Sequence, residues 1–401
     1  MRSVVLLFCF SSSLLLAAES DAVAISANIQ ARHTPFGTML DPIFSAPDSD
    51  QVTGYTRCGD SAIWTGHYLA AEAFRYKVTR SADALANAKR ALDGLTLLTD
   101  VTGTNLLARC AVPVESDFAP GITQEEAANG VWFGSAGGQA YLWIGNTSRD
   151  QYSGVFFGLG VAYDMIDDAG VRTQASGLAT RLLQFLIDRL WNIVLPDGSI
   201  STTFLIRPDE QLALLQIGRH LNSGQFGSVY NKLAGEAALV PVPVSVDVAD
   251  PSGSYYKFNL DAINFDHLLP LESNFFRRLF YGVAYDTFRA TVAGHQNAHF
   301  NMIDRVVHGA DRRRDSDTAA FLDQWLERPR RDVFVDLHGT VPVCGDQACD
   351  PIPVALRAPT DFLWQRSPFQ LSGGGSGQIE SAGIDYILPY WMARYYKIVN
   401  Q

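Results

Sequence analysis

The sequence predicts an all-α fold in which an inner layer of helices is enclosed by an outer layer. Segments with the hydrophobic period of a helix come in pairs along the 401 residues, and the two members of a pair differ in kind. The first member is apolar on nearly every side, as expected of a helix that others surround, whereas the second is apolar on one face only. Strand patterns are few and short. Each pair therefore indicates a hairpin of one inner and one outer helix.

The first two pairs show this contrast most clearly. Residues 61–77 and 151–166 are apolar nearly all round. In the segments that follow them, from Ala82 and from Gln174, apolar side chains hold a single stripe while charged and polar residues face away from it. We therefore expect two buried helices, each followed by a surface helix.

The two inner helices also share a short motif, which indicates an internal repeat. Trp64 and Gly66 of the first helix align with Tyr152 and Gly154 of the second, and Gly158 lies one turn further along the second helix. Small residues at these positions would let the two helices approach each other closely.

The remaining helices follow the same order with less contrast. The third inner helix begins at Pro208, where a proline in the first turn and two acids at the positive end of the helix dipole form a start signature. Residues 240–248 alternate like a strand, but their prolines confine them to a sheet edge or an extended loop, and 333–337 is a second short strand candidate. The later pairs are 208–220 with 227–238, 257–268 with 272–291 and 298–309 with 317–327, and a last inner helix covers 383–398.

Residues 1–24 have the features of a secretory signal peptide: a basic start at Arg2, an apolar middle and a small-residue end, with cleavage expected after Ala18 or Ala24. The alternative is a membrane anchor, but serines interrupt the apolar run, which is shorter than the ~20 residues that a spanning helix needs. We therefore expect a secreted or periplasmic protein without stable membrane insertion. Residues 25–54 would form an extended or looped segment, and residues 55–401 a single helical domain.

The cysteines agree with an oxidising compartment. Cys9 lies in the predicted signal peptide, which leaves the even number of four. Cys344 and Cys349 bracket a short polar loop that a local disulfide would close, leaving Cys58 to pair with Cys110. The alternative, a zinc site, needs tight pairs such as C-x-x-C, which the sequence lacks. We predict two disulfides and no metal.

Composition and charge exclude several classes of protein. Hydrophobic residues make up 47% and charged residues 18%, which is typical of a globular protein and not of a disordered or collagen-like one. With 31 Lys and Arg against 42 Asp and Glu, the net charge is −11, so we expect no nucleic-acid partner. No P-loop, dinucleotide fingerprint or G-x-S-x-G motif occurs, and we predict no cofactor. The oligomeric state is left open.

The paired layers, the internal repeat and the polar residues before the inner helices resemble the six-hairpin, (α/α)-toroid superfamily of carbohydrate-active proteins. That group includes glycoside hydrolases, unsaturated-uronide hydrolases and sugar epimerases, and polysaccharide lyases have related incomplete toroids. The resemblance covers residues 55–398 and is architectural. It implies an (α/α)6-type toroid with few short β segments in its loops, an active site where loops lead into the inner helices, and an oligo- or polysaccharide substrate.

The loops before the inner helices hold most of the unusual polar residues. If the layers are as predicted, these residues converge on one mouth. Flat aromatic faces suit the apolar faces of pyranose rings, so aromatic residues near the same loops are candidate sugar contacts. The candidate substrate-binding residues are Arg57, Trp64, His67, Trp132, Trp143, Arg149, Tyr152, His295, Asn297, Asn301 and Trp364.

Hydrolysis of a glycosidic bond needs one carboxyl group as acid and usually a second as nucleophile or base. Asp60 and Asp150 are the preferred pair, with Glu380 in reserve, and Arg149 would orient a carboxylate or bind an acidic sugar. The alternative is that both aspartates only start helices: Ser148 and the glutamine three residues later match a capping box, and Asp60 is an N-cap by position.

The histidines suggest a different reaction. In a polysaccharide lyase or an epimerase, His299 or His67 would act as base and a tyrosine as acid, while Asn297 or Asn301 neutralised the carboxylate of a uronic sugar. The alternative for each histidine is a hydrogen-bonded residue of the core. A further possibility is a noncatalytic sugar-binding or scaffold toroid. The sequence therefore predicts a glycoside hydrolase first, a lyase or epimerase second and a binding protein third.

Overall fold

The structure is a computed structural model that describes residues 17–250, 255–359 and 361–400. Of the described residues, 56% are helical and 14% lie in strands. The first 16 residues of the predicted signal peptide lie outside this part of the chain. No helix in the described ranges is long and apolar enough to cross a membrane.

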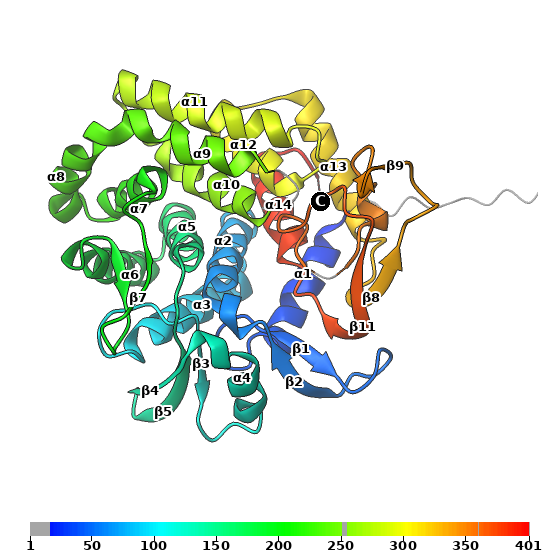
Figure 1. The fold of residues 1–401 in the computed structure, drawn as a ribbon, viewed down its shortest axis with the longest axis horizontal. Coiled ribbons are helices and arrows are strands. Elements are labelled where there is room, and N and C mark those ends of the chain that lie inside the picture. Colours follow the sequence, from blue (N-terminus) through cyan, green and yellow to red (C-terminus); the bar gives the residue numbers. More distant parts are fainter. Residues whose placement is uncertain (1–16, 251–254, 360, 401) are drawn as a thin grey trace, which may run out of the picture.

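Six helices form a closed ring in which each helix packs against the next and the last packs against the first (Figure 1). Most of their residues are buried, as expected of helices with neighbours on all sides. In chain order the ring consists of α2 (Ser61–Thr79), α5 (Arg149–Met165), α7 (Pro208–Leu221), α10 (Tyr256–Leu268), α12 (Ala298–His308) and α14 (Ile384–Tyr395).

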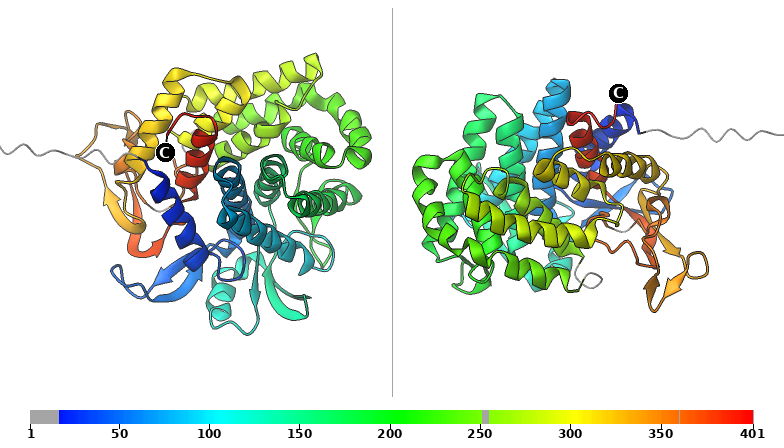
Figure 2. Two further views of the ribbon diagram at one scale, coloured as in Figure 1. Left: turned by 180° about the vertical axis from the view of Figure 1, so that it is seen from behind. Right: turned by 90° about the horizontal axis from the view of Figure 1, so that it is seen from above.

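A second set of helices packs against the outside of the ring, as the two views of Figure 2 show. Each follows a ring helix in the chain and packs against it, and α1 at the start of the described chain packs against α14. These helices are α1 (Glu19–Asn28), α3 (Ala82–Asp100), α6 (Ala169–Asp188), α8 (Ser223–Leu233), α11 (Phe275–Val292) and α13 (Arg312–Trp325), with the short α4 (Ala119–Glu125) and α9 (Pro241–Val248) in connections.

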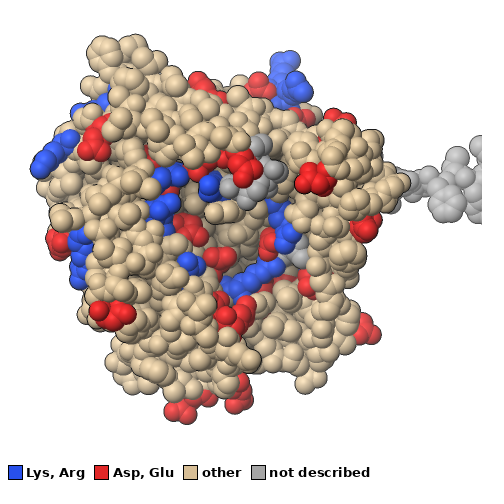
Figure 3. Space-filling model, viewed as in Figure 1, with Lys and Arg blue, Asp and Glu red and all other residues tan. Residues whose placement is uncertain are grey.

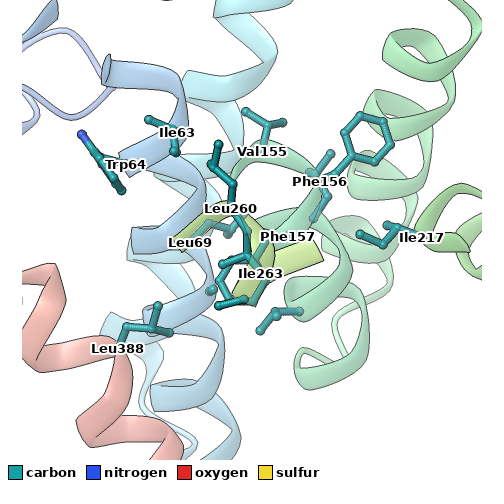
Figure 4. Packing of buried hydrophobic residues seen from close by; sticks show 14 of the residues in the cluster. Ile63, Trp64, Leu69, Val155, Phe156, Phe157, Ile217, Leu260, Ile263 and Leu388 are labelled. Atoms are coloured by element: carbon teal, nitrogen blue, oxygen red, sulfur yellow. The ribbon is translucent and has the colours of Figure 1, made fainter. Parts of the chain in front are cut away.

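The closest approach within the ring is between α2 and α5, where glycines meet. A Cβ atom on Gly66 would overlap the carbonyl oxygen of Gly154, and one on Gly158 would overlap the carbonyl oxygen of Gly66. The two backbones therefore touch, as the predicted repeat required. Figure 4 shows how Ile63 of α2 and Phe157 of α5 lie in the packed interior beside this contact.

The prediction of an all-α protein is wrong, because four small antiparallel sheets accompany the helices. The largest joins the two ends of the described chain: Ile43 is paired with Ile379 across 336 positions. Such pairing leaves no local period in the sequence, and β11 is mostly glycine and serine. The sheets are β2 (Val52–Thr56), β1 (Asp41–Phe44), β11 (Ser372–Glu380) and β8 (Arg331–Asp336); β3 (Cys110–Pro113), β5 (Gln139–Ile144) and β4 (Val131–Ala136); β6 (Asn192–Val194) with β7 (Ile200–Thr203); and β9 (Val343–Cys344) with β10 (Gln347–Ala348).

Individual segments differ from prediction for identifiable reasons. The segment predicted as a strand at residues 240–248 forms helix α9, Pro241–Val248, since proline is tolerated in the first turn of a helix. The segment expected to be extended from residue 25 begins within α1 and continues as a π-helix, Ile29–His33, before β1 and β2. The strand expected at 333–337 is present as β8.

Both predicted disulfides are present, Cys58–Cys110 and Cys344–Cys349. The first joins the 3-10 turn Cys58–Asp60, which leads into α2, to strand β3. This bond therefore fixes the entrance of the first ring helix against the sheet beside it.

Candidate active site at the N-terminal ends of the ring helices

The N-terminal ends of the ring helices meet around a hollow, here called the mouth. Figure 3 shows this hollow in the middle of the face seen in Figure 1, with cationic and anionic side chains gathered inside it. A pocket of about 320 Å³ forms part of the mouth. It is lined by Ser148, Arg149, Asp150, Thr202, Arg207, Glu210, Asp247, Tyr256, Lys257 and Leu260.

Asp60 and Asp150 lie together in the mouth. They stand at the N-terminal ends of α2 and α5, the two helices whose glycines touch. The side-chain nitrogen of Gln151, Nε2, lies 3.2 Å from Asp60 Oδ1 and 3.5 Å from Asp150 Oδ2. Its oxygen accepts a hydrogen bond from the backbone nitrogen of Ile63 at 3.0 Å. One buried glutamine thus joins both carboxyl groups and both helices.

Neither carboxyl group is occupied in capping its helix. Asp60 has the N-cap position of α2, but its side chain accepts no capping hydrogen bond. Ser148, the N-cap of α5, makes none either, because its hydroxyl accepts a hydrogen bond from Arg109 at 2.6 Å. Gln151 faces the other helix and not the N-cap backbone. The predicted capping box is therefore not formed, although Asp150 lies in the first turn of α5, where a negative charge also favours the helix dipole.

Arg109, which the sequence did not single out, holds the loops that carry the pair. Its guanidinium donates to the carbonyl oxygens of Gly59 at 2.6 Å and Asn146 at 2.9 Å, besides the Ser148 hydroxyl. The same group lies 3.7 Å from Asp60 Oδ1. Because Arg109 is next to the disulfide-bonded Cys110, covalent and polar contacts fix the two loops together.

The environment of Asp60 favours its protonated form. Partial burial and the charge of Asp150 raise the pKa of Asp60 to about 6, against the opposing effects of Arg109 and the Gln151 amide. A carboxyl group that keeps its proton in weakly acidic solution can donate it to a leaving group.

A buried cluster of charges lies beside this pair, at the start of α7. Arg207 forms ion pairs with Asp209 at 2.7 Å, Glu210 at 3.1 Å and Asp247 at 2.6 Å, and lies 3.6 Å from Asp261. Burial raises the pKa of Glu210 and raises that of Asp261 far above its usual range. The sequence showed only a helix-start signature here, because Asp247 and Asp261 come from α9 and α10.

The other two cations of the pocket are also paired within the protein. Arg149 Nε lies 2.7 Å from Glu210 Oε2, and its Nη1 donates to the carbonyl oxygen of Thr203 at 3.2 Å. Lys257 Nζ lies 3.4 Å from Asp247 Oδ1. Each cation that lines the pocket therefore already faces a carboxylate of this chain.

A layer of aromatic rings closes the ring helices beneath the mouth. The Trp364 ring lies 4.6 Å from His299 and 5.2 Å from His67, and the Trp64 ring lies 4.9 Å from Phe362, measured between centroids. All five side chains are buried. The fold thus brings together Trp64, Trp364 and the two histidines, as predicted. They are packed against one another beneath the mouth and do not line its pocket.

Burial keeps these histidines uncharged. His67 Nδ1 donates to the carbonyl oxygen of Ile63 at 2.9 Å, and burial lowers its pKa to about 4. Burial also lowers the pKa of His299, and neither of its ring nitrogens has a hydrogen-bond partner among the described residues. Nothing positions either ring against a reacting group in the mouth.

The other residues proposed around α12 have structural partners. Asn297 caps the helix by accepting hydrogen bonds from the backbone nitrogens of His299 at 3.1 Å and Phe300 at 3.3 Å. Asn301 accepts one from Arg289 at 3.0 Å. His295 stacks on a tyrosine ring, and burial lowers its pKa to about 4.

Glu380 and Arg57 belong to ion pairs around the sheet that contains β1 and β11. Glu380 accepts hydrogen bonds from Asn28 at 2.7 Å and Arg331 at 3.1 Å, and His33 Nε2 lies 3.4 Å away. Despite burial, the hydrogen bonds from His33 and Asn28 and the charge of Arg330 lower the pKa of Glu380 to about 2. Arg57 forms ion pairs with Asp41 at 2.9 Å and Asp361 at 2.8 Å.

The aromatic residues expected to bind sugars from the second loop are used in packing. Trp132 and Trp143 stack on each other in the β4–β5 hairpin, with ring centroids 5.8 Å apart. The hydroxyl of the buried Tyr152 accepts a hydrogen bond from the backbone of Leu107 at 3.3 Å. Tyr256, which the sequence did not single out, is 50% exposed and lines the pocket. It is therefore the better candidate for a sugar contact.

Comparison of the chain with protein-family models, with curated proteins and with solved structures gave no match. Across the described ranges, no group of three or more His, Cys, Asp or Glu side chains is arranged to hold a metal ion.

Proposed function

We propose that this chain is a carbohydrate-active enzyme that hydrolyses glycosidic bonds at the mouth. The observation that carries the proposal is the pair of carboxyl groups that share the Gln151 amide within 3.5 Å. Because both oxygens contact one nitrogen, the two carboxyl groups are close enough to act on the same glycosidic bond, as the acid pair of a glycoside hydrolase must. Burial and the charge of Asp150 raise the pKa of Asp60 to about 6.

The two groups would divide the reaction between them. Asp60 protonates the oxygen of the leaving group, since it holds a proton at the pH where a free aspartate has lost it. Asp150 acts from the other side of the anomeric carbon, as the base that activates water or as the nucleophile. Arg109 and Gln151 touch Asp60 and hold it in place, so they are positioning residues.

The contacts of the pocket favour a neutral sugar. Arg207 and Lys257 face Asp247 and Arg149 faces Glu210, so each cation already has an acidic partner within the protein and is less available to the carboxylate of a uronic sugar. Ion pairs of this kind present donors and acceptors side by side, which suits neighbouring hydroxyl groups. Elimination has less support, because His67 and His299 are buried and the Asn297 amide nitrogen already donates to the carbonyl oxygen of Leu363 at 3.4 Å.

We also propose that the protein is exported with cleavage after Ala18. Helix α1 begins at the next residue, Glu19, so this cut removes the N-cap Ala18 but none of the helical residues. A cut after Ala24 would remove the buried Ala22 and the ion pair of Glu19 with Arg394. Two disulfides agree with an oxidising compartment. Mass spectrometry of the exported chain would test the cleavage position, and a mature N-terminus after Ala24 would refute it.

The reaction is tested by incubating the purified chain with neutral, amino and uronic glycans. New reducing ends without the absorbance of an unsaturated sugar would support hydrolysis, and the unsaturated product would refute it. Asp60→Asn and Asp150→Asn should each remove the activity. Asp83→Asn is the matched control, because Asp83 also lies in the first turn of a helix, on α3 outside the ring. Full activity in both mouth variants would refute the assignment.

A further inference from the structure

One part of the molecular surface is unusually apolar. Of the twenty exposed large hydrophobic side chains in the described ranges, eight belong to α11, to α9 and to the 3-10 turn Ala234–Leu239 that leads into α9. Helices α9 and α11 pack against each other along one edge of the molecule (Figure 1). This surface, the α9–α11 face, consists of Leu239, Val242, Val246, Phe275, Phe276, Leu279, Phe280 and Val283.

Helix α11 is apolar on two sides, which is unusual for an outer helix. Its inward side is buried through Tyr281, Tyr285 and Phe288. Its outward side exposes 73% of Phe275 and 52% of Leu279, where a surface helix normally carries polar residues. Apolar patches of this kind on a folded chain mark interaction surfaces.

The outward side of α11 contains a shallow groove of about 230 Å³. Gly282 lies within it, and a Cβ atom placed there would meet nothing within 4 Å. A glycine inside a helix costs about 1 kcal/mol relative to alanine, and no contact with another described residue requires it here. The missing side chain allows another helix to approach closely. The groove is lined by Phe275, Arg278, Leu279, Gly282, Val283 and Asp286.

The groove carries one cation and one anion, placed so that the grooves of two copies can pair opposite charges. Arg278 and Asp286 lie four residues before and after Gly282, so each is ~6 Å along the helix axis from the glycine. If a second α11 packs antiparallel across Gly282, Arg278 of one copy lies level with Asp286 of the other, and the reverse pair forms by symmetry. A two-fold interface needs a patch that matches itself in this way.

We propose that the α9–α11 face joins two copies of this chain in a two-fold dimer, with α11 antiparallel to α11 across Gly282. The inference is independent of the proposed hydrolysis. Arg278 donates through Nη1 to the carbonyl oxygens of Leu269 and Glu272 at 3.3 Å, and Asp286 lies 3.2 Å from His308. These contacts hold both side chains at the rim of the groove.

The test is sedimentation equilibrium of the mature chain. The wild type should have the mass of a dimer. Leu279→Glu should be monomeric with an unchanged melting temperature, because the residue is exposed and the variant buries a charge only on association. Phe334→Glu is the matched control: Phe334 is also exposed, at 65%, but lies on β8 and should leave the dimer intact.

A charge exchange tests the register and excludes a different partner. Arg278→Asp and Asp286→Arg should each weaken self-association about tenfold or more, because like charges then meet twice across the axis. An equimolar mixture of the two variants should associate again, since each pair in the mixed dimer is of opposite charge. This arm does not depend on the folding of Leu279→Glu.

Three results would overturn the proposal. A wild-type chain that stays monomeric up to its highest soluble concentration rules out the dimer. A dimer that survives both Leu279→Glu and the single charge variants uses another surface. If the mixed charge variants do not associate, the antiparallel arrangement across Gly282 is wrong.

Discussion

Two carboxyl groups of this protein, the half-buried Asp60 and the buried Glu380, have opposite shifts of pKa. Glu380 is held by Asn28, Arg331 and His33, and its pKa falls to about 2. Asp60 lies beside another carboxyl group, has Arg109 no nearer than 3.7 Å, and its pKa rises to about 6. The first arrangement stabilises a charge, and the second stabilises a proton.

The opposite pKa shifts distinguish a carboxylate that stabilises the fold from a carboxyl group suited to proton transfer. A carboxylate with a complete set of donors adds stability and has little reason to give or take a proton. A carboxyl group with few hydrogen-bond donors around it lowers the stability of the fold. Groups with pKa values shifted in this way concentrate at active sites. The α2–α5 entrance, and not the β11 region, is therefore where we place catalysis.

The largest expected effect is the loss of activity when Asp60 is replaced. Asp60→Asn removes the proton donor, so activity on a susceptible glycan should fall about 10²–10⁴-fold. The melting temperature should stay within experimental scatter, because the amide fits the same space and can still accept from Gln151. Initial rates and thermal melts of the same samples give both numbers. A large loss of stability with activity retained would reverse the roles given to the two regions.

Glu380→Gln should show the reverse pattern. Removing the charge leaves Arg331 and His33 with a neutral partner, and we expect a loss of about 3 kcal/mol in the free energy of unfolding. The soluble fraction should keep its activity. Urea unfolding followed by fluorescence measures the free energy of unfolding. Glu115→Gln, at an exposed glutamate, is the control. Lost activity in a fully folded Glu380→Gln sample would contradict the comparison.

The pH dependence of stability should differ in sign between the regions. The pKa of Asp60 is raised from 3.8 to about 6, so its contribution is present in acid and is lost as the pH rises through this interval. The pKa of Glu380 is lowered from 4.5 to about 2, so its contribution is present above the interval and is lost as the pH falls through it. Unfolding free energies of the wild type and each variant across these pH ranges should diverge accordingly. Parallel curves would refute the assigned environments.

The helices of this fold were predictable from the sequence, and the sheets were not. The start of α2 at Ser61 and of α7 at Pro208 agree with prediction, because amphipathic period and first-turn chemistry are local properties. The pairing of Ile43 with Ile379 is set by the closure of the whole chain. A fold class predicted only from the local hydrophobic period of the sequence was therefore all-α, and the sheets were missed.

The candidate site divides in the same way. Asp60 and Asp150 were found because each precedes a helix that is apolar all round, a feature visible in the sequence. Arg109 was missed because its partners Gly59 and Asn146 are distant in the chain. Gln151 was assigned to a cap at its own helix, whereas the structure turns it to the neighbouring one.

The smallest expected effect comes from replacing Gln151. Its amide donates a hydrogen bond that favours the charged form of Asp60. Gln151→Met removes that bond, so the pKa of Asp60 should rise and the alkaline limb of the activity profile should move to higher pH. The variant also leaves the backbone nitrogen of Ile63 without its acceptor, at a cost of about 1 kcal/mol in stability. Gln225→Met, at an exposed glutamine of α8, is the control for the substitution itself. A limb that moves to lower pH, or stays in place while stability falls, would show that another group sets the protonation of the mouth.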